Sequence, residues 1–403
     1  MTELAPLVGV DAAPPLARTM TLDITRLLAR ARHGTPTGID RVELAYARWL
    51  LAWPGGVGFD AWVPGLGFMS YSRAAAARLV GSLEARWGAG DDTGWTHSAR
   101  AYSGLRPRRE GARDTLHLIV SHQHLDQLDR RMRRDAGRKT VVYLHDTIPC
   151  DYPEYARPGG SRRHERRMMN AIALADAVIV NSAATERSLE PFMAASGRRP
   201  PLLVAPLGVE PHLTAAPTGD AGEAPYFLCL GTIEPRKNHL LLLHVWRTLV
   251  AQGKGERLPR LILVGRRGWE NENVVDLLDR SHGLGGLVTE RGSVGDAELG
   301  RLLAGARAVL MPSFAEGYGL PVAEALAAGV PVIASDIAVL RETGGDTADY
   351  LDPLDGPAWI AAIRDYARPD SPRRAAQIAR MAGWTAPRWS DHFASVAPFL
   401  EAL

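Results

Sequence analysis

The sequence is poor in cysteine and contains no long uninterrupted apolar run. Its two cysteines, Cys150 and Cys229, do not form a CxxC pair, which argues against a metal or redox role for them. No segment approaches the roughly 20 consecutive apolar residues that a membrane-spanning helix needs. Residues 1–18 lack the basic start of a signal peptide, so we expect a loose tail there and a cytoplasmic location.

Several signatures of cofactor-dependent and metal-dependent enzymes are also absent. An NAD-dependent oxidoreductase needs GxGxxG between a first strand and a helix. The nearest approximation, GVGFDA at 56–61, follows a predicted helix and leads into a strand-like segment, so its order is wrong. The chain has no P-loop, no nucleophile elbow and no D-x-D motif. His122 and His124 have HxH spacing but no third ligand is suggested, and we therefore predict no metal and no bound cofactor.

Charge is nearly balanced over the whole chain but not along it. The formal net charge is +2, whereas residues 100–167 hold 16 Lys and Arg against 9 Asp and Glu. The surplus lies mainly at 106–110, 130–134 and 161–167. Either these arginines are solvated helix faces, or they attract an anionic membrane surface or a phosphate-bearing acceptor. Nucleic acid is disfavoured because aromatic residues are not interleaved with the basic runs.

Short apolar segments alternate with helical stretches in two series, a pattern typical of parallel sheets covered on both faces. The first series comprises 19–28, 116–120, 140–146, 177–182 and 202–208, and the second comprises 226–231, 258–265, 284–292, 306–313 and 330–336. Residues 211–224 are rich in Pro, Ala, Gly and Thr and are the expected linker. The fold class predicted is α/β, with two doubly wound Rossmann-like domains facing a central cleft, where ligands bind at the carboxyl ends of the strands.

The expected boundaries follow from this alternation. The prediction is a tail at 1–18, an N-terminal domain at 19–212 on the acceptor side, and a C-terminal domain at 213–385 on the donor side. A C-terminal helix at 386–403 is expected to pack back on the N-terminal domain.

The segment SFAEGYGLPVAEALAAGVPVIASD (313–336) is the strongest candidate site. A strand ends near Ser313, a glycine-containing turn follows, and Pro321 stands where a helix is expected to begin. Amide groups at such a helix start suit a pyrophosphate. Here they belong to Tyr318, Gly319 and Leu320.

Two carboxylates flank this turn. Glu316 precedes the predicted helix, and Glu324 lies in its first turns. Carboxylates accept hydrogen bonds from vicinal hydroxyls, so this pair suits a sugar on one side and a ribose on the other. The plain alternative is that Glu324 only favours the helix terminus and Glu316 is an ordinary loop residue.

A pair of cations follows the first strand of the second series. Arg236 and Lys237 lie in TIEPRKN, just before another predicted helix. Cations at a helix N-terminus oppose the helix dipole, so an anionic group should compensate them. A diphosphate leaving group would do so, and its developing charge would be stabilised there.

The combination of GTIEPRKN with EGYGLPVAE resembles the retaining family-4 glycosyltransferases, with mannosyltransferase-like features. The resemblance covers about residues 226–343 and implies the GT-B fold, no obligatory metal, and a nucleotide-sugar donor held mainly by the C-terminal domain. By this resemblance Arg236 and Lys237 bind the donor diphosphate, and Glu316 holds the transferred sugar. The remaining donor contacts that it implies are Gly265, Ser293, Val294, Gly317, Tyr318, Gly319, Leu320 and Glu324.

The chain departs from the family pattern at one position. Many members carry arginine directly after the glycine that ends the first strand of this domain, and here Thr232 occupies that place. Arg236 is expected to supply the charge instead. The stretch VGRRGWE (264–270) resembles the GxxGW sequence of mannosyltransferase-like members, which favours GDP-mannose over UDP-linked donors.

The N-terminal half resembles the family more loosely. Gly38 precedes the first long helix, where a glycine lets the backbone approach phosphate or acceptor; a plain loop glycine is the alternative. His145 ends a predicted strand, and in similar enzymes this histidine contacts the donor sugar. Asp40 and Asp146 are candidate acceptor contacts.

The function predicted is transfer of a hexose, with retention of anomeric configuration, from a GDP- or UDP-linked sugar to a saccharide. A lipid-linked acceptor in polysaccharide or glycolipid assembly would give the basic segments a purpose at the inner face of the membrane. A GT-B sugar-nucleotide epimerase or hydrolase is the alternative in the same fold, and it would need no acceptor surface.

Overall fold

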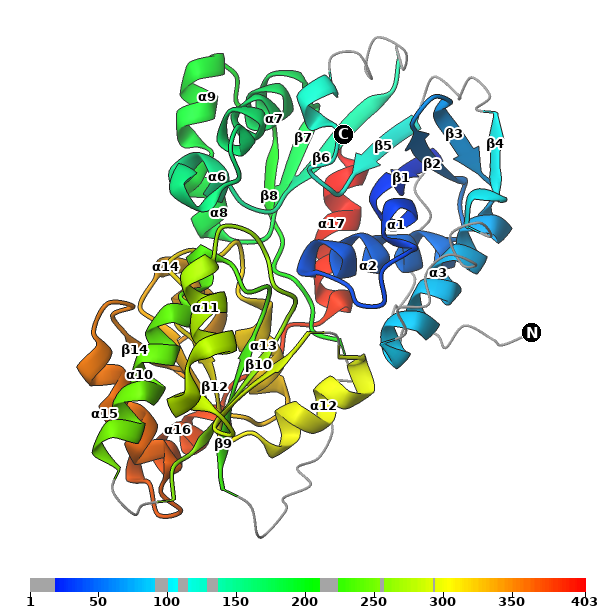
Figure 1. Ribbon diagram of the computed structural model, residues 1–403. Helices are drawn as coiled ribbons and strands as arrows, with labels where there is room; N and C mark the ends of the chain where they lie inside the picture. Colours follow the sequence, from blue (N-terminus) through cyan, green and yellow to red (C-terminus); the bar gives the residue numbers. More distant parts are fainter. Residues whose placement is uncertain are drawn as a thin grey trace. The chain divides into compact units, whose positions relative to one another are not determined.

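The computed structural model describes residues 19–90, 101–107, 115–128, 137–210, 224–253, 257–292 and 294–403. The chain divides into two compact units. The first unit comprises residues up to Asp151, Gly159–Gly208 and Pro387–Leu403, and the second comprises Tyr152–Pro158 and Val209–Ala386. Each unit contains one β-sheet with helices on both faces (Figure 1). The predicted pair of doubly wound α/β domains is therefore confirmed.

The sheet of the first unit has eight strands in the order β4-β3-β2-β1-β5-β6-β7-β8. Its pairs are parallel from β2 to β8, whereas β3 and β4 add to one edge in antiparallel fashion. The strands are β1 Thr19–Asp23, β2 Val57–Val63, β3 Gly67–Tyr71, β4 Leu105–Pro107, β5 Thr115–Ile119, β6 Lys139–Leu144, β7 Ala177–Val180 and β8 Leu202–Val204.

The first apolar segment is shorter as a strand than the sequence pattern suggests. The run 19–28 forms β1 only as far as Asp23, whose Oδ1 accepts a hydrogen bond of 2.8 Å from the Thr25 amide and turns the chain into a helix. The helices and 3-10 turns of this unit are α1 Thr25–Arg30, α2 Gly38–Ala52, α3 Arg73–Ala89, η1 Leu125–Gln127, α6 Ile148–Asp151, α7 Gly160–Leu174, α8 Ala183–Ser188, α9 Glu190–Ser196 and α17 Trp389–Glu401.

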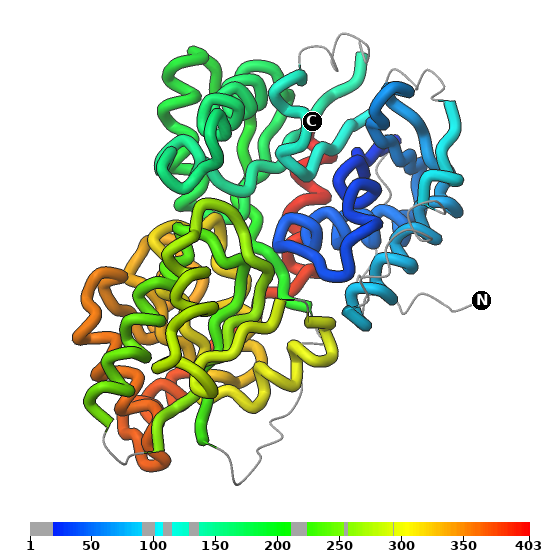
Figure 2. Tube along the Cα trace, in the orientation of Figure 1, coloured from blue at the N-terminus to red at the C-terminus, as the bar shows by residue number. Residues whose placement is uncertain are grey.

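The C-terminal helix α17 is part of the first unit, beside segments far from it in sequence (Figure 2). His392 links α17 to the segment after β8 and to α2. One of its ring nitrogens lies 2.9 Å from the Pro206 carbonyl, and the other lies 3.0 Å from the Tyr46 hydroxyl. Gly208 is required at this junction, since a Cβ there would lie 2.2 Å from the Trp389 nitrogen.

The sheet of the second unit has six parallel strands in the order β11-β10-β9-β12-β13-β14. Its strands are β9 Tyr226–Leu230, β10 Arg260–Val264, β11 Val288–Arg291, β12 Ala308–Met311, β13 Val332–Ser335 and β14 Asp349–Leu351. Its helices and 3-10 turns are η2 Pro153–Tyr155, η4 Pro235–Lys237, α10 His239–Gln252, α11 Glu272–Arg280, η5 His282–Leu284, α12 Asp296–Gly305, α13 Leu320–Ala327, α14 Ala338–Gly344, α15 Gly356–Ala367 and α16 Pro372–Met381.

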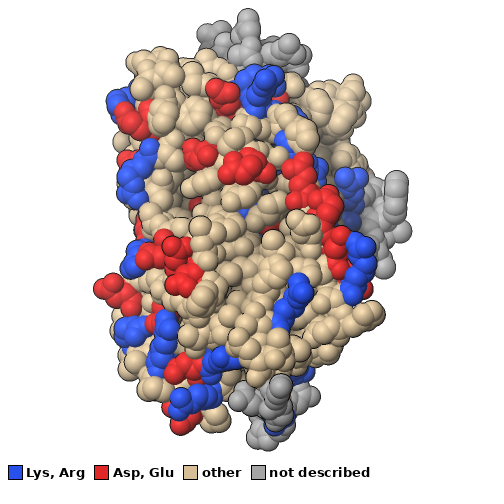
Figure 3. Space-filling view, turned by 60° about the vertical axis from the view of Figure 1, so that its left-hand side comes forward, with Lys and Arg blue, Asp and Glu red and all other residues tan. Residues whose placement is uncertain are grey.

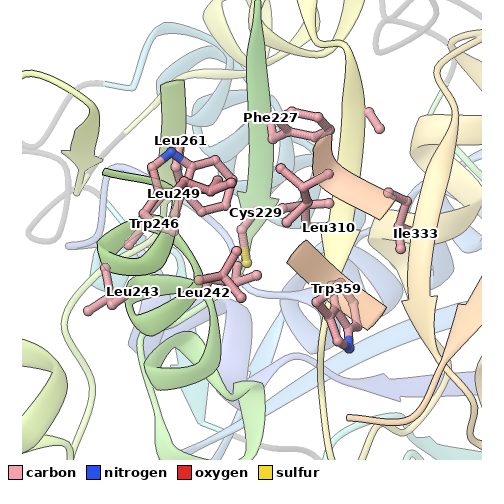
Figure 4. Close-up of a cluster of buried hydrophobic side chains, with 14 of the residues drawn as sticks. Phe227, Cys229, Leu242, Leu243, Trp246, Leu249, Leu261, Leu310, Ile333 and Trp359 are labelled. Atoms are coloured by element: carbon pink, nitrogen blue, oxygen red, sulfur yellow. The ribbon is translucent and has the colours of Figure 1, made fainter. Parts of the chain in front are cut away.

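One face of this second sheet is covered by α10, α11 and α15, which bury a large apolar cluster against the strands (Figure 4). Trp246, Trp359 and Phe227 have no exposed surface in it. Burying a side chain of this kind contributes roughly 1.5–3 kcal/mol or more. The cluster thus fixes the strands whose carboxyl ends carry the polar residues described below.

The two units differ from the expected boundaries at residues 152–158, at Val209, where the second unit resumes, and at Ala386, where it ends. Residues 152–158 were expected in the N-terminal domain, but they group with the second unit. The expected linker lies outside the described residues except for its last position. Among the helices that are described, none is long and apolar enough to cross a bilayer.

Candidate functional site

The candidate site lies where two neighbouring strands of the second sheet end. Strands β9 and β12 pair in parallel, so their carboxyl ends meet at one edge of the sheet. The turn after β9 and the loop after β12 are joined by a 2.8 Å hydrogen bond from the Phe314 amide to the Arg236 carbonyl. Asn238 adds a second link by donating to the Pro312 carbonyl at 3.1 Å. These bonds bring the two predicted motifs together.

Arg236, Lys237 and Glu316 form one ion cluster. Lys237 Nζ donates to Glu316 Oε1 at 2.6 Å, and Arg236 Nη1 donates to Glu316 Oε2 at 3.0 Å. Glu234, which sequence reasoning missed, lies 2.6 Å from Arg236 Nη2 through its Oε1. Two cations and two carboxylates therefore balance in charge. The compensation expected for the cations at this helix start is provided, within the protein, by these glutamates.

Burial makes this cluster strong. Only 6% of the Glu316 side chain and 10% of the Lys237 side chain are exposed, compared with 23% for Arg236. Burial by itself raises the pKa of Glu316, but the charges of Lys237 and Arg236 outweigh it and lower that pKa to about 2. Glu316 is therefore an anion at neutral pH. Arg236 is the more accessible of the two cations.

Glycine is required where the backbone of β9 meets that of β10. Gly265 follows β10, and a Cβ there would lie 1.9 Å from the Gly231 carbonyl oxygen. Gly231 has a φ of +134°, and a Cβ on it would lie 3.3 Å from Lys237 Cε. Gly231 thus leaves space for the Lys237 stem, and Gly265 allows the two backbones to approach closely. Gly265, expected to contact the donor, has at least this packing role.

The turn before α13 has the geometry of a tight helix entry. Gly319 has a φ of +93°, and a Cβ there would lie 2.6 Å from Leu340 Cδ2. The Thr343 hydroxyl donates to the Tyr318 carbonyl and so holds this turn. Leu320 is the first helical residue, so Pro321 stands second rather than first. Amide groups in a first helical turn lack intrahelical acceptors and are suited to bind phosphate.

Other residues expected at the donor lie around the same sheet edge. Glu324 is buried within α13, and Gly317 lies directly after Glu316. Val294 is 9% exposed just beyond β11, whereas Ser293 lies outside the described residues. Thr232 lies in the turn after β9 and is half-buried. Their predicted ligand contacts stay predictions.

Two backbone hydrogen bonds join the loop after β10 to the turn after β9. The Gly268 amide donates to the Ile233 carbonyl at 2.9 Å, and the Ile233 amide donates to the Arg266 carbonyl at 2.9 Å. A Cβ on Gly268 would lie 2.8 Å from the Ile233 oxygen. This explains why the GxxGW stretch needs its second glycine, and it fixes the position of Trp269.

Residues 152–158 pack, through Tyr155 and Arg157, on aromatic side chains of the loops beside this site. The sequence did not predict this contact. The rings of Tyr155 and Phe314 are stacked, with centroids 6.0 Å apart. Trp269 Nε1 donates to the Tyr155 carbonyl at 3.1 Å, and Arg157 lies 4.9 Å from the centre of the Trp269 ring. The closely spaced tyrosines of DYPEY were the only available signal, and they gave no indication of a partner.

His145 and Asp146 lie just beyond β6 in the first unit. The His145 side chain is buried, with Nε2 2.7 Å from the Val120 carbonyl, and its amide donates to His122 Nε2 at 2.9 Å. Burial lowers the pKa of His145 to about 4, so its ring is neutral at physiological pH. Asp146 is half-buried, and its Oδ1 accepts from the Ile148 amide at 3.2 Å. Their predicted ligand contacts are untested.

Asp40 has a different position from the one expected of an acceptor contact. Its side chain is fully buried, lies 2.6 Å from Arg26 and 3.0 Å from Arg30, and closes a capping box with Thr37. The carboxylate therefore holds the start of α2, and its predicted acceptor contact stays a prediction. Gly38, the first residue of α2, is exposed.

In the parts of the chain that the structure describes, no group of three or more His, Cys, Asp and Glu side chains is arranged to hold a metal ion. His122 and His124 thus have no third partner of that kind among these residues.

The segment that contains this site is similar to known proteins. Residues 224–368 match the family model described as glycosyl transferases group 1. An O-antigen chain mannosyltransferase B of Escherichia coli is 41% identical over 151 residues, 38% of this chain and 39% of that protein. The serotype-specific mannosyltransferase WbdA of Escherichia coli is 30% identical over 250 residues, 58% of this chain and 30% of that protein. The matched segments span less than half of either relative.

A solved structure extends the likeness to nearly the whole chain. The structure of Anabaena Alr3699/HepE in complex with UDP and glucose has a TM-score of 0.64 and 17% sequence identity. The match covers 96% of this chain and 100% of that one. At this identity the match establishes the fold alone. Residues 224–368 therefore match the group 1 glycosyltransferases, and the chain has the two-domain GT-B fold.

Proposed function

We propose that the protein transfers a hexose from a nucleotide-diphosphate sugar to a saccharide with retention of anomeric configuration. The observation that carries the proposal is the cluster of Arg236, Lys237 and Glu316 beside the start of α13. It combines cations for a diphosphate with a carboxylate for sugar hydroxyls. Such a set of preorganised charges stabilises a leaving group without rearrangement during the reaction.

The roles of the three side chains follow from their accessibility. Arg236 is the more exposed cation, and its guanidinium carries five donors that match phosphate oxygens. Lys237 is more deeply buried than Arg236, donates to Glu316, and adds positive charge close to the strand ends. Glu316 remains ionised and accepts hydrogen bonds from the sugar, which positions the anomeric carbon.

The reaction that we propose breaks the bond between the anomeric carbon and the terminal phosphate oxygen. The acceptor hydroxyl forms the new bond on the same face, and its proton passes to a phosphate oxygen of the leaving nucleoside diphosphate. The protein contributes positioning and charge stabilisation, and it needs neither a strong base nor a metal ion.

Mannose is the sugar that we favour, with GDP as the nucleotide. The support is the GRRGW stretch and the similarity to the two Escherichia coli relatives, both mannosyltransferases. One relative acts on an O-antigen chain, which suggests a growing, lipid-linked polysaccharide as acceptor. A place at the inner face of the membrane would follow from such an acceptor.

A direct test combines donor binding with product stereochemistry. The protein is screened for thermal stabilisation by GDP-mannose, UDP-glucose and UDP-N-acetylglucosamine, and for slow release of free sugar. GDP-mannose is expected to stabilise the protein most, and NMR of the transfer product should show the α configuration of the donor. An inverted product would rule out the retaining mechanism. Sugar release or epimerisation with no transfer to any saccharide would favour the hydrolase or epimerase alternative.

A further inference from the structure

Residues 152–158 form a short arm within the second unit, although the chain on both sides of it belongs to the first. Three contacts hold it: the Tyr155–Phe314 ring stack, the hydrogen bond from Trp269 to the Tyr155 carbonyl, and the Arg157–Trp269 cation–π contact. These contacts reach the loop after β12 and the loop after β10. The arm is therefore fixed to both of the loops that border the ion cluster.

The rings of this arm form a short row. Tyr152 is stacked on Tyr155 with centroids 5.8 Å apart and planes at 25°, and Tyr155 is stacked on Phe314 with planes at 11°. Phe314 lies two residues before Glu316. At the other end of the row, Tyr152 is 40% exposed. The row thus runs from the loop that carries Glu316 to an aromatic ring at the surface.

Local hydrogen bonds order the arm without a ligand. Pro153 begins the 3-10 turn Pro153–Tyr155, and the Tyr155 amide donates to the Tyr152 carbonyl at 3.0 Å. The Ala156 amide donates to the Pro153 carbonyl at 3.1 Å. A ring that is already held in place loses little conformational entropy when a ligand packs on it. An exposed aromatic side chain that is ordered in this way is suited to recognition.

We propose that the exposed ring of Tyr152 is a binding platform for a pyranose ring of the acceptor saccharide. This inference rests on the proposed transferase function. A pyranose presents C–H groups on its faces and hydroxyls at its rim, which matches an apolar ring with polar neighbours. Glu154 and Arg157, both exposed, flank the row and provide an acceptor and donors for hydroxyls.

The position of the row favours a saccharide over the nucleobase of the donor. The row ends on the loop after β12, which carries the carboxylate assigned to sugar. The base is expected by resemblance at Val294, after β11, and two strands separate β11 from β12 in the sheet. The charge of the arm is mixed, with Glu154 as well as Arg157, so a polyanion is not its natural occupant.

The test compares Tyr152→Ala with Tyr152→Trp in the full-length protein, using α-mannobiose and maltose as probe acceptors. Tyr152→Ala should raise the acceptor KM by about fivefold to tenfold, the size expected for loss of one aromatic contact. Tyr152→Trp should keep the acceptor KM within twofold, because it preserves the flat surface. The donor KM and donor hydrolysis should stay within twofold of wild type in both variants.

Tyr102→Ala is a matched control, because Tyr102 is 42% exposed and belongs to the first unit. It should leave the acceptor KM unchanged. Saturation-transfer NMR gives a reading that does not depend on turnover: wild type should transfer magnetisation to mannobiose, and Tyr152→Ala should reduce the signal several-fold.

The outcomes separate this inference from the proposed function. An unchanged acceptor KM in Tyr152→Ala, or no NMR signal from wild type with either disaccharide, would overturn the platform while transferase activity stands. A rise in the donor KM instead would assign the ring to the nucleotide and also overturn it. Sugar release without transfer in wild type would reject the transferase function, and the NMR signal would still decide on the platform.

Discussion

Lys237 and Glu316 are 79 positions apart in the chain and form a 2.6 Å hydrogen-bonded ion pair across the edge of one sheet. The pair exists because β9 and β12 are adjacent and parallel, so the segments that follow them start from the same edge. Arg236 contacts the same Glu316 carboxylate and also contacts the carboxylate of Glu234. Removing any one of these charges therefore leaves its partners unbalanced in a mostly buried place.

Loss of the lysine charge should impair donor turnover. Lys237→Ala is expected to lower the rate of donor use by roughly 100-fold or more, as removal of one transition-state donor typically does. Steady-state kinetics with the preferred nucleotide sugar measures the effect, and circular dichroism checks the fold. Arg280→Gln is a control, since it removes an exposed arginine paired with Asp276 on the surface of α11. Normal turnover by folded Lys237→Ala would show that the diphosphate site lies elsewhere.

The depressed pKa of Glu316 predicts a specific loss of stability in acid. Its folded-state pKa is about 2 and its ordinary value is 4.5, so its contribution is complete above about pH 4.5 and disappears as pH falls towards 2. The shift corresponds to about 3 kcal/mol. Urea unfolding at pH 7, 5, 4 and 3 should show a steeper loss in wild type than in Glu316→Gln. Equal pH dependence of the two proteins would contradict the buried ion pair.

Activity should survive chelation of divalent metals. The proposed diphosphate contacts are Arg236, Lys237 and helix amides, so no bridging cation is required. Transfer rates are to be compared before and after dialysis against EDTA, with and without added Mn²⁺ and Mg²⁺. A strict dependence on either ion would contradict the proposed mechanism.

The close approach of the first two strands of the second unit should make Gly265 intolerant of a side chain. Gly265→Ala would place a Cβ 1.9 Å from the Gly231 oxygen, which forces the backbone apart. We expect destabilisation of about 2–4 kcal/mol and a lower melting temperature. Gly283→Ala is the matched control, because no atom lies within 4 Å of a Cβ placed there. Equal melting temperatures for the two variants would mean that the strand ends are not packed as described.

The basic residues of α7, together with exposed Arg106 in β4, belong to the described part of the predicted membrane surface. Arg163 and Arg167 lie 3.0 Å and 3.4 Å from Asp126, whereas Arg162 and Arg166 are exposed. The cluster at 130–134 lies outside the described residues. On the face shown in Figure 3, basic and acidic residues are interspersed. Among the residues of α7, attraction to anionic lipid would depend mainly on the exposed arginines.

Vesicle binding tests whether the exposed arginines of α7 attract anionic lipid. The protein should bind phosphatidylserine-containing vesicles in low salt and leave them at moderate salt, because screening acts over about 8–10 Å. Arg162→Gln with Arg166→Gln should weaken binding, at about 1 kcal/mol per residue, without changing donor hydrolysis. Replacing exposed Arg364 in the second unit is the control. Equal affinity for neutral and anionic vesicles would identify these arginines as ordinary solvated residues.

Local chemistry in the sequence was sufficient for the strands and for the two motifs of the second unit. Continuous apolar runs predicted β9, β10, β12 and β13, because a strand buried on both faces needs apolar residues at consecutive positions. The glycine-rich turn before α13 was predicted from Gly319 and Pro321, apart from the shift of the proline by one position. The same local reasoning failed at 19–28, where the Asp23 carboxylate ends β1 after five residues.

The environment of Asp40 and the contacts of the arm at 152–158 could not be predicted from neighbouring residues in the sequence. An aspartate three positions after Thr37 fits both a capping box and a ligand contact, and only the burial of its carboxylate distinguishes them. Tyr155 has no sequence neighbour that identifies Phe314 or Trp269 as its partners. These contacts join residues 159 and 114 positions apart, and they form only when the whole unit has folded.

The sequence by itself determined the two α/β domains, the turns that end their strands, and the residue types of the proposed diphosphate site. It did so because strand burial, helix entry and glycine conformation depend on neighbouring residues. Only the tertiary structure decided that Glu316 pairs with Lys237 and Arg236, that Asp40 is a helix cap, and that Tyr152 ends a row of stacked rings. Ion pairs and ring stacks depend on distances between residues far apart in the chain, and strand order and packing fix those distances.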